Sequence, residues 1–288
     1  MELRLFQVDA FAGNIFRGNP AAVCPLQEWL SDETLQSIAQ ENNLAETAYF
    51  VPLNGEFHLR WFTPRLEVDL CGHATLASAF VIFTELETTR QAVRFESRSG
   101  PLFVKRNQAL LTMDFPSWGL TRCEQPPAAL LEGLGKQPLE IFSVTPGTNY
   151  FVVFGTEAEV ISIRPNFTRL EELHPYGVII TAPGDNADCA SRYFVPSYGI
   201  PEDPVTGSIH SALTPFWAKR LNKKEIHARQ VSSRGGDLFC EDRGERVNIS
   251  GHAIKYLDGK IYIPLSFGLP GSSASLLSVC GPFSLQNA

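Results

Sequence analysis

Two stretches of the chain place reactive side chains close to a glycine that opens a run of small residues. The first, CGHATLASA at 71–79, offers a thiol at Cys71 and an imidazole at His73. The second, PEDPVTGSIH at 201–210, offers a carboxyl at Asp203. Proteins use thiols, imidazoles and carboxyls as nucleophiles, as general acids and bases, and as metal ligands. Both stretches are therefore candidate parts of a functional site.

The thiol of Cys71 allows more than one interpretation. At a helix N-terminus it would have a lowered pKa and could be a reactive thiolate, but a buried cysteine also packs as a small apolar residue. With His73 it forms only a C-x-H pair, and a third ligand would have to be His210 from the other stretch. Zinc sites need a second pair of ligands at a suitable spacing. We therefore predict no metal.

Ser208, next to the glycine of the second stretch, raises the possibility of hydrolase chemistry. It could combine with His73 or His210 and an acid, or it could simply cap the following helix. The chain contains no G-x-S-x-G elbow, which argues against an α/β-hydrolase site. It contains neither G-x-G-x-x-G nor a P-loop sequence, so we predict no nucleotide cofactor.

Glu46 is a further candidate, because it lies in NNLAETAYF where a predicted helix meets an apolar strand. Glutamates at such junctions are usually just exposed. A carboxyl beside Leu44, Ala48 and Phe50 would instead be partly desolvated, which suits a general acid or base. The sequence leaves both interpretations open.

The elements that position these residues are mostly strands. Runs with strand-like patterns are 4–11, 47–52, 57–63, 92–97, 101–105, 109–115, 141–145, 150–154, 177–182, 191–196, 226–232, 246–250 and 260–264. The clearest helix begins after Ser31, a suitable N-cap, and should end near Asn42 and Asn43. Many strands with few helices indicate an α+β protein rather than a doubly wound one.

An internal repeat suggests two similar halves. Residues 60–79 read RWFTPRLEVDLCGHATLASA and residues 192–214 read RYFVPSYGIPEDPVTGSIHSALT. Each has Arg-aromatic-Phe-x-Pro, then a loop, then a glycine that opens a small-residue helix. We predict halves at 1–120 and 121–264, with the last strand returning to the first half. The Gly/Ser/Pro-rich segment 265–288 should be a loosely attached tail.

The glycines of the repeat, Gly72 and Gly207, would place two helix starts in one molecule. The first turn of a helix has backbone N–H groups without intrahelical partners and the positive end of the helix dipole. Two such ends facing one cleft would bind an anion, and a small carboxylic acid is the expected ligand. Alternatively, the glycines and alanines only allow each helix to pack tightly inside its half.

Composition excludes several classes of protein. The formal net charge is -7 and Lys and Arg form no blocks, which argues against a nucleic-acid partner. No apolar stretch approaches 18 residues, so we expect no membrane span. The six cysteines are scattered without a C-x-x-C pair, and the N-terminus does not resemble a signal peptide, so we expect reduced thiols and a cytoplasmic location.

Five motifs together resemble the PhzF-like (phenazine biosynthesis-like) family. They are DAFAGNIFRGNPAAVC (9–24), NNLAETAYF (42–50), the two repeated stretches, and RGGDLF (234–239). The resemblance implies a diaminopimelate epimerase-like fold, in which two halves related by pseudo-twofold symmetry each wrap a curved, mostly antiparallel sheet around a central helix. It also implies a homodimer that uses no metal, nucleotide or flavin.

The resemblance assigns roles to residues of this chain. It makes Glu46 the group that removes a proton from carbon and returns it elsewhere on the same substrate, with His73 and Asp203 assisting. The residues that it implies for substrate binding are Gly72, Gly207, Ser208, Asn19 and Thr75. The expected function is thus a cofactor-independent isomerase acting on a small carboxylic acid in a biosynthetic process.

Two alternatives stay open. In the epimerase relatives, two cysteines at the two helix starts act as opposed bases, but here Cys71 is matched by Thr206, so that two-thiol mechanism is not available. A racemase or hydrolase that depends on Cys71 alone is one alternative. The other is a non-catalytic module that binds a small molecule or a protein, because a fold alone does not define an activity.

Overall fold

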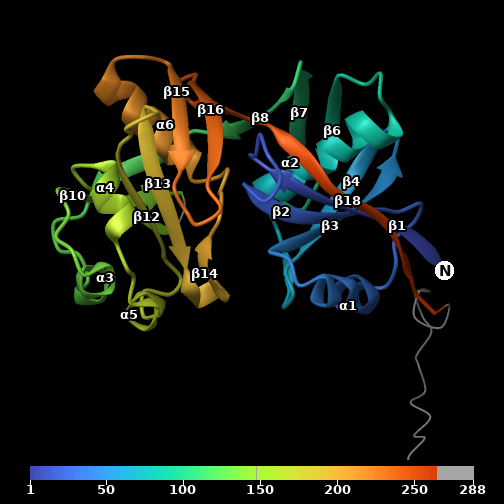
Figure 1. The fold of residues 1–288 in the computed structure, drawn as a ribbon, viewed down its shortest axis with the longest axis horizontal. Coiled ribbons are helices and arrows are strands. Elements are labelled where there is room, and N and C mark those ends of the chain that lie inside the picture. The colour runs from blue at the N-terminus through green and yellow to red at the C-terminus, as the bar shows by residue number, and fades with distance from the viewer. Residues whose placement is uncertain (147, 265–288) are drawn as a thin grey trace, which may run out of the picture.

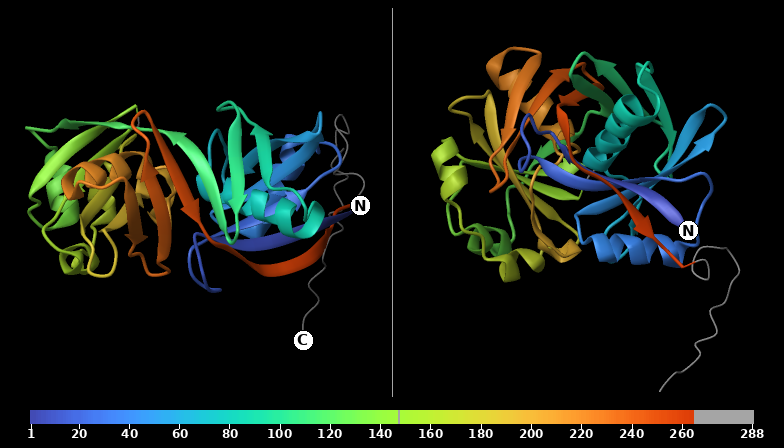
Figure 2. Two further views of the ribbon diagram at one scale, coloured as in Figure 1. Left: turned by 90° about the horizontal axis from the view of Figure 1, so that it is seen from above. Right: turned by 45° about the vertical axis from the view of Figure 1, so that its right-hand side comes forward.

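The computed structural model describes residues 1–146 and 148–264, and these form two halves that lie side by side (Figure 1). Each half is a curved sheet that wraps around one central helix, α2 (Gly72–Val81) or α6 (His210–Leu221) (Figures 1 and 2). No helix in these ranges is long and apolar enough to cross a membrane. The predicted tail at 265–288 lies outside the described residues.

The strands of the first half are β1 (Glu2–Ala10), β2 (Asn19–Pro25), β3 (Glu46–Leu53), β4 (Glu56–Phe62), β5 (Glu67–Val68), β6 (Ala92–Glu96), β7 (Leu102–Asn107) and β8 (Leu110–Pro116). The later strands are β9 (Gly119–Arg122), β10 (Glu140–Thr145), β11 (Asn149–Val153), β12 (Gly177–Pro183), β13 (Cys189–Val195), β14 (Ile200–Asp203), β15 (Glu225–Gln230), β16 (Gly236–Asp242), β17 (Arg246–Gly251) and β18 (Ala253–Tyr262). The other helices are α1 (Asp32–Asn42), the π-helical η1 (Ile82–Leu86), α3 (Ala128–Leu134), α4 (Glu157–Ser162), α5 (Phe167–Glu171) and the 3₁₀-helical η2 (Pro196–Tyr198).

The pattern of strand pairing is the same in both halves. In the first, β2 pairs antiparallel to β1 and parallel to β3, and β4 pairs antiparallel to β3 and parallel to β6. In the second half, β11 pairs antiparallel to β10 and parallel to β12, and β13 pairs antiparallel to β12 and parallel to β15. β18 crosses back to the first half and pairs with β1 (Figure 1). The equivalent pairing in the second half is that of β9 with β10. The two halves are also joined by the pairing of β8 with β17. The α+β class and the internal repeat are thereby confirmed, whereas the proposed boundary at residue 120 stays a prediction.

The first helix begins and ends where its sequence predicts. Ser31 caps α1 by accepting a hydrogen bond from the backbone N–H of Thr34. At the other end Asn43 adopts a left-handed conformation with φ 49°, and its N–H donates to the carbonyl of Ala39. Asparagine tolerates this conformation, which turns the chain out of the helix. Three residues later β3 begins with Glu46, so the end of α1 determines where that carboxyl lies.

The central helices begin differently. α2 starts at Gly72 as predicted, but α6 starts at His210, three residues after Gly207. The intervening residues form a tight turn in which the N–H of His210 donates to the carbonyl of Gly207. The predicted helix start at Gly207 is therefore corrected to a turn that leads into the helix. α6 continues through Pro215, and the Ser211 carbonyl that a residue 215 N–H would normally reach accepts from Trp118 instead.

A loop from each half fastens the two together. The Nη2 of Arg234 donates to Oδ1 of Asp9 at 2.8 Å, and its Nε donates to the carbonyl of Gly18 at 2.8 Å. Gly18 has φ +68°, and a Cβ there would lie 2.2 Å from the carbonyl oxygen of Ala10, so no other residue fits this approach. Asp9 is buried, and burial raises its pKa. The pairing of Asp9 with a guanidinium from the other half therefore offsets the cost of burying its charge.

Candidate active site

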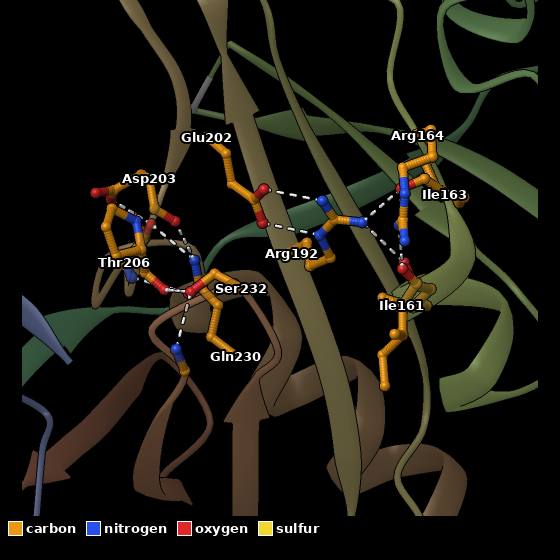
Figure 3. Close-up of polar contacts among 12 residues, drawn as sticks. Ile161, Ile163, Arg164, Arg192, Glu202, Asp203, Thr206, Gln230 and Ser232 are labelled. Atoms are coloured by element: carbon orange, nitrogen blue, oxygen red, sulfur yellow. Dashed lines mark hydrogen bonds and ion pairs between the residues drawn. The ribbon is translucent and has the colours of Figure 1, made fainter. Parts of the chain in front are cut away.

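Each repeated arginine grips a glutamate from the loop that precedes a central helix. In the second half, Nε and Nη2 of Arg192 donate to the two carboxylate oxygens of Glu202, both at 2.8 Å, and its Nη1 donates to the carbonyl of Ile163 (Figure 3). In the first half, Arg60 donates in the same way to Glu67 at 2.7 and 2.8 Å. Paired donors fix both distance and orientation. The two loops are therefore fastened at equivalent points.

The strand register aligns the halves residue by residue. Glu67 and Glu202 each pair with the phenylalanine of the Arg-aromatic-Phe motif. Five residues after each glutamate stand Gly72 and Gly207. Cys71 therefore corresponds to a threonine, Thr206, as the sequence comparison of the two stretches predicts.

The start of α2 lies next to the turn that leads into α6. A Cβ built on Gly72 would lie 3.8 Å from Cα of Gly207 and 3.9 Å from the backbone nitrogen of Ser208. These are ordinary van der Waals separations, so the two backbone segments lie next to each other with no room for a larger side chain between them than a methyl group. The unpaired amides of the first turn of α2 and of the turn before α6 thus border one small region. Such a region attracts a negatively charged group.

A cavity of about 560 Å³ opens at this contact. The predicted site residues that line it are Glu46, Gly72, His73, Asp203, Gly207 and Ser208. They come from four segments: β3, the start of α2, the end of β14, and the turn that leads into α6. Cavities of this size hold small-molecule ligands.

Glu46 and His73 lie next to each other in the lining of this cavity. The Oε2 of Glu46 lies 3.1 Å from Nε2 of His73, and the Glu46 side chain is 13% exposed. The pair is close but not aligned for a hydrogen bond, and within the described residues neither atom has another hydrogen-bond partner. Buried polar atoms are normally satisfied. A ligand that bonds to both atoms would complete this part of the site.

The charge of Glu46 acts on the neighbouring imidazole. Burial lowers the pKa of His73, but Cys71 and the Glu46 carboxylate act in the opposite direction, and the pKa is raised well above its usual range. Cys71 is a neutral thiol at neutral pH, so we attribute the rise to Glu46. The imidazolium and the Glu46 carboxylate then form a buried ion pair.

Cys71 supports the imidazole from the other side. Its Sγ lies 3.5 Å from Nδ1 of His73. Burial, and then the nearby Glu46 charge, raise the pKa of the Cys71 thiol to about 11. Nucleophilic cysteines have lowered pKa values, so this environment argues against a reactive thiolate.

Glu46, Cys71 and His73 could also hold a metal ion, because their donor atoms all lie within 4.8 Å of one another. Cysteine binds metals as the thiolate, so binding would first have to remove a proton from a thiol whose pKa is about 11. Against that cost, the three donors are the sulfur, nitrogen and oxygen ligands that zinc accepts. The absence of a metal stays a prediction.

Asp203 belongs to a buried hydrogen-bond network (Figure 3). Its Oδ1 accepts from Nδ2 of Asn19 at 2.7 Å, and its Oδ2 accepts from the hydroxyl of Thr206. Gln230 fixes the backbone of the same loop, since its Nε2 donates to the Asp203 carbonyl and its Oε1 accepts from the N–H of Thr206, both at 2.8 Å. Burial raises the pKa of Asp203 to about 6, with a further upward contribution from Glu46.

Asn19 and Thr75, which the family resemblance suggests as substrate-binding residues, do not line the cavity. The amide of Asn19 lies behind it and donates to Asp203 and to the carbonyl of Val205 at 2.9 Å. The hydroxyl of Thr75 donates to the carbonyl of Cys71 at 2.6 Å, within the first turn of α2. The amide nitrogen of Asn19 and the hydroxyl of Thr75 hold the walls of the site, whereas Oδ1 of Asn19 has no hydrogen-bond partner among the described residues. A role of either side chain in substrate binding stays a prediction.

The second half has no counterpart of Glu46. Gly177 occupies the equivalent place, because each stands one residue before the residue that pairs with the repeated phenylalanine. A Cβ on Gly177 would lie 2.6 Å from both Oδ1 of Asn149 and the hydroxyl of Tyr193. These two groups are hydrogen-bonded to each other at 2.8 Å and fill the space that a second glutamate would need. The cavity therefore has one such carboxyl.

Comparison with known proteins agrees with this architecture. A family model described as "Phenazine biosynthesis-like protein" matches residues 8–259. The chain belongs to this family. An uncharacterized isomerase of Pseudomonas aeruginosa is 49% identical over 263 residues, which cover 91% of this chain and 100% of that protein. A human phenazine biosynthesis-like domain-containing protein is 36% identical, with 91% of this chain and 99% of that protein covered.

Solved structures confirm the fold predicted for this phenazine biosynthesis-like protein. A PhzF-family protein of Enterococcus faecalis superimposes with a TM-score of 0.87 at 44% identity, covering 91% of this chain and 100% of that one. A probable proline racemase of Agrobacterium radiobacter, 11% identical, superimposes with a TM-score of 0.60 over 91% of this chain and 93% of that one. The diaminopimelate epimerase-like fold is thus shared well beyond the family.

Proposed function

We propose that this protein is a cofactor-independent isomerase that removes a proton from a carbon of a small carboxylic acid and returns it to another atom of the same molecule. The observation that carries the proposal is the placement of Glu46. It is the carboxyl that lies beside His73 in a cavity where the start of α2 meets the turn before α6, and its counterpart in the second half is a glycine. A single acid–base group suits a proton shift within one substrate.

The expected steps follow from this arrangement. The Glu46 carboxylate takes the proton, and the electron pair of the broken C–H bond delocalises toward the carboxylate or unsaturated system of the substrate. The amides near Gly72 and Gly207 are fixed donors for the resulting enolate-like charge. His73 balances the change of charge on Glu46, and Asp203, which is partly protonated near pH 6, assists the transfer. The protonated Glu46 then returns the proton at the second position.

Hydrogen exchange in heavy water tests this proposal. Aromatic and dihydroaromatic acids are screened first for thermal stabilisation, since a ligand that binds the folded state raises the unfolding midpoint. For acids that bind, deuterium incorporation at carbon is followed by NMR in the wild type and in Glu46→Gln. Removing a general base typically lowers the rate by about 10²- to 10⁴-fold. We expect a loss in this range with unchanged ligand affinity.

Glu41→Gln is a suitable control, because Glu41 is an exposed residue of α1 close to Glu46 in the sequence. It should exchange at the wild-type rate. Full exchange activity in Glu46→Gln would remove the mechanism. Binding of several acids without any exchange in the wild type would instead favour a non-catalytic binding module.

A further inference from the structure

The cavity has a fixed positive charge at its rim. Arg65 is the one arginine or lysine in the cavity lining, which also contains the carboxyls of Glu46 and Asp203. Arg65 is exposed, and in the part of the chain that the structure describes no carboxylate lies within ion-pair distance of its guanidinium. By contrast, the strand residues Arg60 and Arg192 each form an ion pair with a glutamate.

Arg65 is held in place at both ends. On the backbone side, the hydroxyl of Thr63 accepts hydrogen bonds from the N–H groups of Arg65 and Leu66, at 3.2 and 3.1 Å, in the turn after β4. On the side-chain side, the guanidinium lies against Gly199 of the other half. A Cβ on Gly199 would be only 3.0 Å from Nη1 and 3.2 Å from Cζ of Arg65. The glycine, with φ +84°, therefore leaves the space in which the guanidinium rests.

The position of this contact breaks the symmetry of the cleft. Gly199 belongs to the segment between Phe194 and Glu202, which is three residues longer than the matching segment between Phe62 and Glu67. The extra length forms η2, whose Tyr198 also lines the cavity. The longer loop of one half thus meets the arginine of the other, and the cavity gains a cationic rim on one side. The rest of the lining is largely apolar and includes Leu66, Val68 and Ile200.

We infer that the ligand of this site is a dianion: a small acid with one carboxylate at the paired helix starts and a second carboxylate at Arg65, joined by an unsaturated or cyclic apolar body. This inference rests on the proposed function for the first carboxylate. The second follows from the guanidinium, which binds carboxylates through paired N–H donors. Its charge also draws anions toward a protein whose net charge is -7.

Three ring acids of matched shape test the inference by isothermal titration: benzoate, isophthalate and terephthalate. The wild type should bind at least one of the two dicarboxylates about tenfold more tightly than benzoate. Arg65→Gln should remove this preference by weakening dicarboxylate binding more than benzoate binding, whereas Arg65→Lys should retain part of it. Because Arg65 is exposed, both variants should unfold at the wild-type temperature. The preference should also shrink at high ionic strength.

Several outcomes would overturn the inference. They are equal affinity for benzoate and the dicarboxylates, a preference that survives in Arg65→Gln, and failure of both dicarboxylates to bind. The result is independent of the test of Glu46. Loss of hydrogen exchange with an intact Arg65-dependent preference would reject the proposed chemistry alone, and exchange on a monocarboxylate without such a preference would reject the dianion alone.

Discussion

Replacing Asp203 by asparagine should change the free energy of unfolding more favourably at neutral pH than at acidic pH. Burial raises the pKa of Asp203 from 3.8, its ordinary value, to about 6 in the folded state. Between these two values the folded protein binds more protons at this residue than the unfolded chain does. The free energy of unfolding therefore falls as the pH rises through this window, and it stays low above it.

The size of the effect follows from the two pKa values. Each pKa unit corresponds to about 1.4 kcal/mol, so a rise from 3.8 to about 6 means that ionising Asp203 costs the folded state about 3 kcal/mol at pH 7.5. At pH 4 the carboxyl is almost fully protonated in the folded state and about two-fifths protonated in the unfolded chain, so the cost is about 0.6 kcal/mol. Asparagine carries no charge at either pH. The amide nitrogen of asparagine takes the place of an oxygen that accepts a hydrogen bond from Thr206. Loss of this hydrogen bond costs about 1 kcal/mol of stability, and this cost does not depend on pH.

Urea denaturation at a series of pH values between 4 and 7.5 measures this difference. The stability of Asp203→Asn minus that of the wild type should rise by about 2 kcal/mol across the range. Asp69→Asn, at an acid that is 75% exposed, should show no such trend. A difference that is flat with pH, or one that falls as the pH rises, would refute the reasoning. The stabilised variant should also lose activity, because strained active-site groups are retained for function.

Two further substitutions test other parts of the site. Cys71→Ala should lower the rate of hydrogen exchange less than tenfold and shift the pH profile of that rate, because the uncharged thiol contacts His73. If folded Cys71→Ala and Cys71→Ser were both completely inactive, the thiol would instead be catalytic. Gly177→Ala should lower the free energy of unfolding by about 1–3 kcal/mol in urea denaturation, because the added methyl would displace Tyr193. Since Tyr193 lines the cavity, ligand binding should also weaken. Wild-type stability of this variant would show that Asn149 and Tyr193 do not fill the space next to Gly177.

Sequence patterns predict the fold well where the physical signal is local. Ser31 and Asn43 mark both ends of α1 because capping depends on neighbouring residues. β2 was not predicted, since NPAAVCP is buried almost throughout and therefore does not alternate. β5 and β14 were also missed, because they are only two and four residues long and contain poor strand formers.

For the candidate site, too, local sequence patterns predict some features and miss others. The repeat predicts that Gly72 and Gly207 belong together, because two copies of one motif must occupy equivalent places in a symmetric fold. It does not predict Gln230, whose side chain reaches the Asp203 loop from β15, 27 residues later. It does not predict the role of Tyr193 either, since the hydroxyl acts through Asn149, 44 residues earlier in the chain. Such contacts depend on strand register, which no local pattern reveals.

The symmetric scaffold and the asymmetric chemistry have separate causes in this protein. Residues that position the two halves are alike: both arginines of the repeat bind a glutamate, and a glycine stands five residues after each glutamate. Apart from these two glycines, the candidate site residues differ between the halves. The unlike pairs are Glu46 and Gly177, Val68 and Asp203, Cys71 and Thr206, and His73 and Ser208. An enzyme that inverts a centre needs a base on each face, so a symmetric fold serves it directly. A proton shift needs one base and a different environment opposite, and substitution of one member of each pair supplies this without altering the fold.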